Sequence, residues 1–195
     1  MRSRIRILLT AGLAAVFATA IAAGSANASP SGDHSNFVEQ GRAVGLTADQ
    51  IGTLQAKTDA YLAKLGGTQV ALNKIDLNGK AAVFVALPGE DHPRALPPQY
   101  GAQSTDVNCT GGADFLHFCA YSGSNLTGDQ IDMYTCDRYF MPFGSGGSWD
   151  NDQSTGTRAA FYRQDNSLIH FTDPAHSRNL SANWLPVYWV RNCAG

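Results

Sequence analysis

Four cysteines, all in the C-terminal half of a 195-residue chain, constrain its fold more than any other feature of the sequence. They are Cys109, Cys119, Cys136 and Cys193. An even number of cysteines in an exported chain indicates disulfide bonds, which supplement the small hydrophobic core of such domains. The sequence therefore predicts a cysteine-free N-terminal part and a disulfide-braced C-terminal part.

The first 28 residues have the features of an export signal. Three arginines within the first six residues precede an apolar, alanine-rich stretch over residues 7–23, and Ala-Asn-Ala at 26–28 matches a cleavage site. A transmembrane anchor is the alternative, but an anchor usually needs about 20 strongly apolar residues. We expect the signal peptide 1–28 to be cleaved, the protein to be secreted to an extracellular location, and no membrane association to follow.

The remaining chain is mildly acidic. After residue 28, four lysines and seven arginines face sixteen acidic residues, a net charge of −5. Nucleic-acid-binding domains usually carry a basic patch, so we expect no nucleic-acid partner. No C-x-x-C pair occurs, which argues against a zinc or thioredoxin-like role for the cysteines.

One amphipathic helix is predicted near the N-terminus. Residues 29–45 are polar and aperiodic, and we expect them to be a flexible lead-in. Thr47 and Gln50 then form a capping box, apolar residues recur at helical spacing, and glycines at 66–67 end the helix.

A β-hairpin is predicted to follow the helix. The dipeptide Asn78-Gly79 joins two β-rich runs, 68–77 and 80–87, and such a dipeptide between apolar runs is a strong hairpin signal. Residues 46–87 therefore form a small α+β unit, which carries no grouped catalytic side chains.

The composition and the predicted secondary structure of the chain change after a proline-rich segment. Residues 88–107 have the composition of a semi-extended linker, and we place a domain boundary near Gln103. From residue 108, short aromatic strands alternate with Gly/Ser/Asn turns; the strands are expected at 117–121, 130–136, 157–164, 167–171 and 185–193. This pattern predicts that residues 108–195 form an antiparallel sandwich or Greek-key barrel.

Four cysteines allow three pairings, of which we favour one. Cys109 and Cys119 flank a glycine-rich turn. Cys136 ends one strand and Cys193 lies at the C-terminus, so their bridge would pin the last strand in the sheet. Chain-entropy estimates give about 3 and about 4 kcal/mol for the two bridges. A nucleophilic Cys119 beside His117 is the rival interpretation, which the even count argues against.

Three stretches of the C-terminal part resemble the secreted bacterial peptidase-inhibitor family related to the βγ-crystallins. The first, FCAYSGSNLTGDQIDMYTC, has a Greek-key signature at Tyr121, Leu126 and Gly128; the others are GSWDNDQSTGTRAAFY and ANWLPVYWVRNC. The resemblance implies that the α+β unit is followed by an all-β, crystallin-like double Greek key. Leu126 stands where the signature usually has an aromatic residue, and no reactive-site residue of the family can be matched.

The sequence contains candidate ligands for two metals, calcium and zinc. Crystallin-type calcium sites have an Asn/Asp pair, two spacers and a Ser/Thr pair, a pattern that predicts Asp150, Asn151 and Ser154 as calcium ligands. An ordinary Asx-rich turn is the alternative. His170 and His176 match no common zinc-ligand spacing, and we expect no other cofactor.

Aromatic residues are the remaining functional signal. Tyr139, Phe140, Phe143 and Trp149 lie in a Gly/Ser-rich segment, where exposed aromatic side chains would contact a partner. Filling of the core is the alternative for these residues.

No nucleophile elbow or other catalytic motif occurs, so we expect no enzymatic activity. Our leading hypothesis is an inhibitor of extracellular peptidases, metallopeptidases included, that acts through a rigid loop over Met141–Thr155. The rival hypothesis is a crystallin-like module without inhibitory activity, which binds the envelope or cell-wall polysaccharide through the same aromatic residues.

Overall fold

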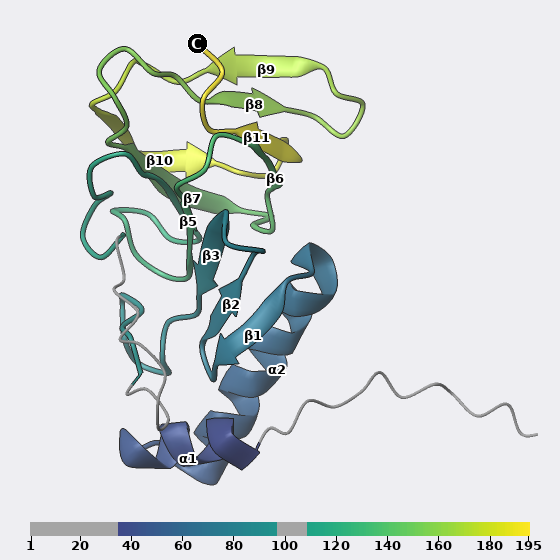
Figure 1. The fold of residues 1–195 in the computed structure, drawn as a ribbon, viewed down its shortest axis with the longest axis vertical. Coiled ribbons are helices and arrows are strands. Elements are labelled where there is room, and N and C mark those ends of the chain that lie inside the picture. The colour runs from purple at the N-terminus through teal and green to yellow at the C-terminus, as the bar shows by residue number, and fades with distance from the viewer. Residues whose placement is uncertain (1–34, 97–108) are drawn as a thin grey trace, which may run out of the picture. The chain divides into compact units, whose positions relative to one another are not determined.

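The computed structural model of the chain describes residues 35–96 and 109–195 (Figure 1). The described residues belong to one compact unit, with two helices and two antiparallel sheets of seven and four strands. The predicted signal peptide, most of the predicted linker and its boundary near Gln103 lie outside the described residues. None of the described helices is long and apolar enough to cross a membrane.

Two helices begin the described chain, α1 (Ser35–Ala43) and α2 (Ala48–Leu65). α2 confirms the sequence prediction, because the Thr47 hydroxyl accepts from the Gln50 amide at 3.3 Å and Gln50 Oε1 accepts from the Thr47 amide at 2.9 Å. α1 occupies a segment that was expected to be an irregular lead-in, and that expectation is wrong for these nine residues. Its buried Gln40 accepts a hydrogen bond from the Leu72 amide at 2.8 Å, a tertiary contact that no local pattern announces.

The predicted hairpin is formed by β2 (Lys74–Asp76) and β3 (Ala81–Phe84). Asn78 and Gly79 both have positive φ, 58° and 68°, as a tight hairpin turn requires. The first predicted strand, 68–77, is divided into β1 (Thr68–Ala71) and β2, because the chain also reverses at residues 72–73. The buried Asn73 amide fixes this reversal by donating to the carbonyl oxygens of Val85 and Arg94, both at 3.0 Å.

The hairpin continues directly into the C-terminal sheet. The seven strands follow the order β1-β2-β3-β5-β4-β7-β10, and the last four of these are β5 (Gln130–Met133), β4 (Phe118–Tyr121), β7 (Gly146–Asn151) and β10 (Ser177–Asn183). β3 pairs antiparallel with β5, with Val83 opposite Ile131. The α+β unit therefore shares one sheet with the C-terminal part (Figure 1).

The second sheet has the order β6-β11-β8-β9. Its strands are β6 (Arg138–Phe140), β8 (Ala160–Tyr162), β9 (Leu168–Phe171) and β11 (Trp189–Arg191). Strands β4 to β7 and β8 to β11 make two consecutive sets of four, and the third strand of each set joins the sheet of the other set. The two sheets are tied together by this exchange of β6 and β10.

The main core contains side chains from both sheets. The ring of Phe118 stacks on Trp149 with centroids 5.9 Å apart and meets Phe161 edge-on at 6.2 Å. Trp184 is fully buried and its indole N–H donates to the Tyr121 carbonyl at 2.8 Å. Gly147 permits this contact, because a Cβ there would collide with the Trp184 indole nitrogen.

Both disulfides form the pairs that the sequence favours, Cys109–Cys119 and Cys136–Cys193, with Cα separations of 5.8 and 5.4 Å. The first pair is fully buried, whereas Cys136 is exposed. All four cysteines are bonded, so the rival interpretation of a nucleophilic Cys119 is wrong.

Candidate functional site

The structure does not present the predicted aromatic contacts on an exposed loop. Tyr139, Phe143 and Trp149 are 7, 5 and 5 % exposed and belong to the main core; only Phe140 is half-buried. The expected loop over Met141–Thr155 contains β7, whose residues from Gly147 to Asn151 are buried. The prediction of three of these four contacts is therefore wrong, because Tyr139 in β6, Trp149 in β7 and Phe143 between the two strands pack into the core.

The predicted calcium ligands do not converge on one point. Asp150 and Asn151 are neighbours in β7, so their side chains point to opposite faces of the sheet. The Asp150 carboxylate binds Arg178 and the Ala113 amide, both at 3.1 Å. The side-chain oxygen of Asn151, Oδ1, accepts from the backbone and side-chain amides of Gln153. Ser154 is exposed beyond the strand. Asp150 Oδ2 and Asn151 Oδ1 are thus engaged within the protein on opposite faces of β7.

Other groupings of metal-ligating residues are equally unsuitable. Among the described residues, one cluster of three close ligand atoms occurs, Cys109, Cys119 and Asp132, and its two sulfur atoms are joined to each other. His176 contacts Asp152, and the ring of His170 packs edge-on against Phe161 at 4.9 Å. Both histidines thus have partners within the protein.

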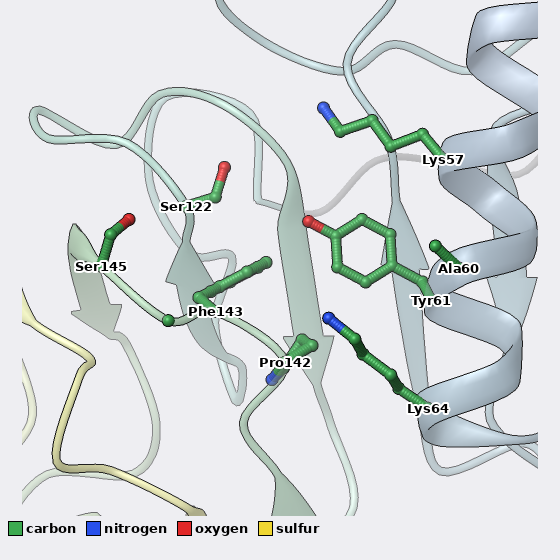
Figure 2. Close-up of a pocket in the computed structure, with 9 residues that line it drawn as sticks. Lys57, Ala60, Tyr61, Lys64, Ser122, Pro142, Phe143 and Ser145 are labelled. Atoms are coloured by element: carbon green, nitrogen blue, oxygen red, sulfur yellow. The ribbon is translucent and has the colours of Figure 1, made fainter.

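A hollow of about 300 Å³ lies between α2 and the loops of the β sheets (Figure 2). Lys57, Tyr61 and Lys64 reach into it from the helix, opposite Ser122, Phe143 and Ser145. The Tyr61 hydroxyl donates to Asp129 at 2.7 Å. Burial, and then the nearby Asp129 carboxylate, raise the pKa of Tyr61, which remains a hydrogen-bond donor rather than a base.

Asp129 makes this hollow a structural joint. Its buried carboxylate accepts hydrogen bonds from Tyr61, from the Lys57 ammonium at 2.8 Å and from the Ala86 amide at 3.0 Å. These contacts attach α2 to the end of β5. No nucleophile and base are paired here, so the hollow has none of the geometry that nucleophilic catalysis requires. Sequence reasoning missed Asp129, because its helix partners lie about 70 residues away along the chain.

The most distinctive exposed feature is the segment 112–117, hereafter the 112–117 loop, enclosed by the buried Cys109–Cys119 disulfide. Phe115 and Leu116 are 64 and 49 % exposed, although both are large apolar side chains. Leu116 has a φ of 75°, a backbone conformation that side-chain-bearing residues seldom adopt. Adjacent exposed apolar residues on a braced turn are typical of a surface that contacts a partner.

Backbone hydrogen bonds hold the 112–117 loop in place. The Leu116 amide donates to the Asp152 carbonyl at 2.8 Å, and the Asp152 amide donates back to the His117 carbonyl at 3.0 Å. Within the loop, the His117 amide donates to the Asp114 carbonyl at 3.0 Å. The apex is therefore fixed to the segment that follows β7.

Side chains beneath the 112–117 loop add further contacts. His117 Nδ1 lies 2.5 Å from the buried Asp132 carboxylate, and Asp150 accepts from the Ala113 amide. The hydrogen bond to Asp132 raises the pKa of His117, although partial burial opposes that shift. The apolar pair in GGADFLH, within a turn closed by two cysteines, is the sequence signal for this loop, although the turn by itself predicts only the disulfide.

The comparisons with known proteins leave the family of this chain open. No family model matches it, and neither a curated protein nor a solved structure shows significant similarity to it.

Proposed function

We propose that the chain is a secreted, non-enzymatic inhibitor of extracellular peptidases, and that the 112–117 loop enters the peptidase cleft. The observation that carries this proposal is the exposure of Phe115 and Leu116 on a turn closed by a buried disulfide. A loop that is rigid before binding loses less conformational entropy when it binds, and its affinity is correspondingly higher. We therefore assign the inhibitory loop to residues 112–117, between Cys109 and Cys119, instead of Met141–Thr155.

The proposal extends to the fold of residues 108–195, which we assign to the crystallin-like double Greek key of the peptidase-inhibitor family. The exchange of β6 and β10 between the sheets supports this assignment, because each set of four antiparallel strands contributes to both layers of one sandwich. The two disulfides support secretion through the signal peptide 1–28, since such bonds persist in oxidising compartments.

The chemistry of the 112–117 loop selects its target. Phe115 and Leu116 fit peptidases whose specificity pocket accepts a bulky apolar side chain, metallopeptidases among them. Peptidases that prefer acidic side chains have a cationic specificity pocket. The 112–117 loop offers such a pocket only one acidic side chain, that of Asp114. Inhibition needs no covalent step, because a rigid loop that fills the cleft excludes the substrate.

An inhibition panel tests the proposal. The purified protein is titrated against metallo-, serine and cysteine peptidases with apolar specificity, beside Phe115→Ala and the control Leu185→Ala. Leu185 is 74 % exposed and lies in the turn before β11, so its substitution removes a comparable apolar side chain elsewhere. We expect inhibition that Phe115→Ala weakens by about tenfold or more, as for an interface hot spot, and that Leu185→Ala leaves intact. Absence of inhibition across all three classes would contradict the proposal.

A further inference from the structure

The outer face of the four-stranded sheet carries a row of aromatic side chains. Trp189 in β11 lies directly opposite Phe140 of β6 on one side and Tyr162 of β8 on the other. The residues next to them in their strands, Tyr139, Phe161 and Val190, belong to the main core. Because side chains alternate along a strand, the three aromatic residues of the row point away from that core.

These aromatic side chains are half-buried rather than covered. Phe140 meets Trp189 edge-on at 5.8 Å, and Tyr188 joins them at 4.8 Å from Phe140 and 5.2 Å from Trp189. Phe140, Tyr188 and Trp189 pack against one another, remain partly accessible and form a rigid apolar surface beside Tyr162. We call Phe140, Tyr162, Tyr188 and Trp189, together with Arg138 and Arg191, the aromatic–arginine face.

The two arginines give this face a positive charge. The Arg138 guanidinium lies over both Tyr162 and Trp189, 5.1 and 4.9 Å from the ring centroids, and one of its nitrogens donates to Asn166 at 2.5 Å. Arg191 lies opposite Arg138 in the neighbouring strand and is exposed. Asp137 also borders the face, but Lys80 neutralises it at 2.7 Å. A cationic face on a chain whose residues 29–195 have a net charge of −5 selects an anionic ligand.

Arginine and aromatic side chains recognise different parts of one ligand. Arg138 and Arg191, with Tyr162, line a shallow hollow of about 370 Å³. A guanidinium held flat by rings keeps its in-plane donors, which suit a planar carboxylate. The half-exposed rings beside it offer apolar area to the C–H face of a sugar, and a row across three strands extends about 10 Å. An open row of this kind lets a polymer continue past both ends.

From this arrangement we infer that the aromatic–arginine face binds an acidic polysaccharide, with uronate carboxylates on Arg138 and Arg191 and sugar rings against the aromatic row. The surface belongs to the four-stranded sheet, whereas the 112–117 loop precedes β4 of the other sheet. Binding at this face would retain the protein at an extracellular matrix or envelope rich in uronic acids and leave the loop accessible. This role replaces the glycan contact that the sequence assigned to Trp149, which is buried.

Affinity electrophoresis and calorimetry with polygalacturonate test the inference. We expect the purified protein to bind polygalacturonate and not a neutral glucan, and Arg138→Gln and Arg191→Gln each to weaken binding by about tenfold, as expected for charge-assisted contacts. Lys64→Gln is the matched control, since Lys64 is an exposed cation on α2 that does not line this hollow; binding by this variant should stay within about twofold of wild type. Trp189→Ala should weaken binding relative to Phe115→Ala, with circular dichroism confirming that each variant is folded.

Three results would overturn the inference. The first is that the protein does not bind polygalacturonate at low salt. The second is that the arginine variants and Lys64→Gln lose polygalacturonate binding to the same extent. The third is that poly-L-glutamate binds equally tightly and with the same dependence on the arginines. The last outcome would assign the face to an acidic protein. Phe115→Ala separates this test from the peptidase proposal, since it should weaken inhibition by about tenfold or more and leave glycan binding unchanged.

Discussion

Removal of the Asp129 carboxylate should destabilise the whole described fold, because this group joins α2 to the seven-stranded sheet. Its side chain is 2 % exposed and accepts from Tyr61, Lys57 and the Ala86 amide. Asp129→Ala leaves the part-buried Ala86 amide and the Tyr61 hydroxyl without their acceptor. Loss of one partner from a buried charged network costs about 3–5 kcal/mol, and we expect a loss in this range.

The partner substitutions should cost less, in a defined order. Tyr61→Phe removes one hydrogen bond to a charged group, worth about 1.5–3 kcal/mol. Lys57 is 48 % exposed, so solvent screens its attraction to Asp129 and Lys57→Met should cost only about 1 kcal/mol. Lys64→Met is the matched control, since Lys64 also reaches the hollow from α2 (Figure 2), whereas the helix residues that bind Asp129 are Lys57 and Tyr61.

Urea unfolding, followed by circular dichroism and by tryptophan fluorescence, measures these free energies. All three tryptophans lie in the C-terminal part, whereas both described helices lie in the N-terminal part. If the shared sheet makes one cooperative unit, the two signals should change together and Asp129→Ala should shift both midpoints. A separate helix transition, or a cost below about 1 kcal/mol for Asp129→Ala, would refute the reasoning.

Further predictions concern the disulfides, His117 and the core. Mild reduction followed by alkylation and peptide mass spectrometry should label the accessible Cys136–Cys193 bridge before the buried one; labelling of Cys109 and Cys119 first would contradict this. Because Asp132 raises the pKa of His117, their contact stabilises the fold most below pH about 6.5, and this contribution is lost as the pH rises through the raised folded-state pKa. Unfolding free energies of wild type and His117→Gln from pH 5 to 9 should therefore converge as the pH rises, and a constant difference would refute the link. Trp149→Ala should cost about 3–5 kcal/mol and lower the melting temperature, whereas an unchanged melting temperature would contradict its place in the core.

Local signals explain which parts of the fold were predictable. Two of these signals, the capping box of Thr47 and the Asn78-Gly79 turn, each depend on a few neighbouring residues. The third is the spacing of four cysteines, which allow only three pairings. They predicted α2, the β2–β3 hairpin and both disulfides correctly. The predominance of antiparallel strands after residue 108 was also expected from the aromatic segments between turns.

Long-range contacts explain what the sequence did not announce. The pairing of β3 with β5 joins segments about 50 residues apart across the predicted linker, and α1 is fixed by the contact of Gln40 with Leu72. The composition of GGSWDN is typical of a turn and predicts a loop, yet these residues form β7, where Gly147 is needed to make room for Trp184. The same error assigned Trp149 to an exposed loop.

The candidate site was less predictable than the fold for a related reason. Exposure of Phe115 and Leu116 depends on the hydrogen bonds with Asp152, which lies over 30 residues further along the chain. The aromatic–arginine face likewise needs the register of β6, β11 and β8, which brings Phe140, Trp189 and Tyr162 into one row. The aromatic–arginine face is assembled from three separate strands, and the exposure of the adjacent pair Phe115 and Leu116 is set by a distant segment, so composition alone identifies neither surface.

Hydroxyl-radical footprinting of the protein, free and bound to an inhibited peptidase, tests the central claim most directly. Phe115 in the 112–117 loop is 64 % exposed, and Phe171 in the edge strand β9 is 43 % exposed. Phe171 therefore serves as a control of the same residue type outside the loop. We predict that peptidase binding suppresses oxidation of Phe115 and leaves the oxidation rate of Phe171 unchanged. Unchanged oxidation of Phe115 in a complex that still inhibits the peptidase would contradict the account.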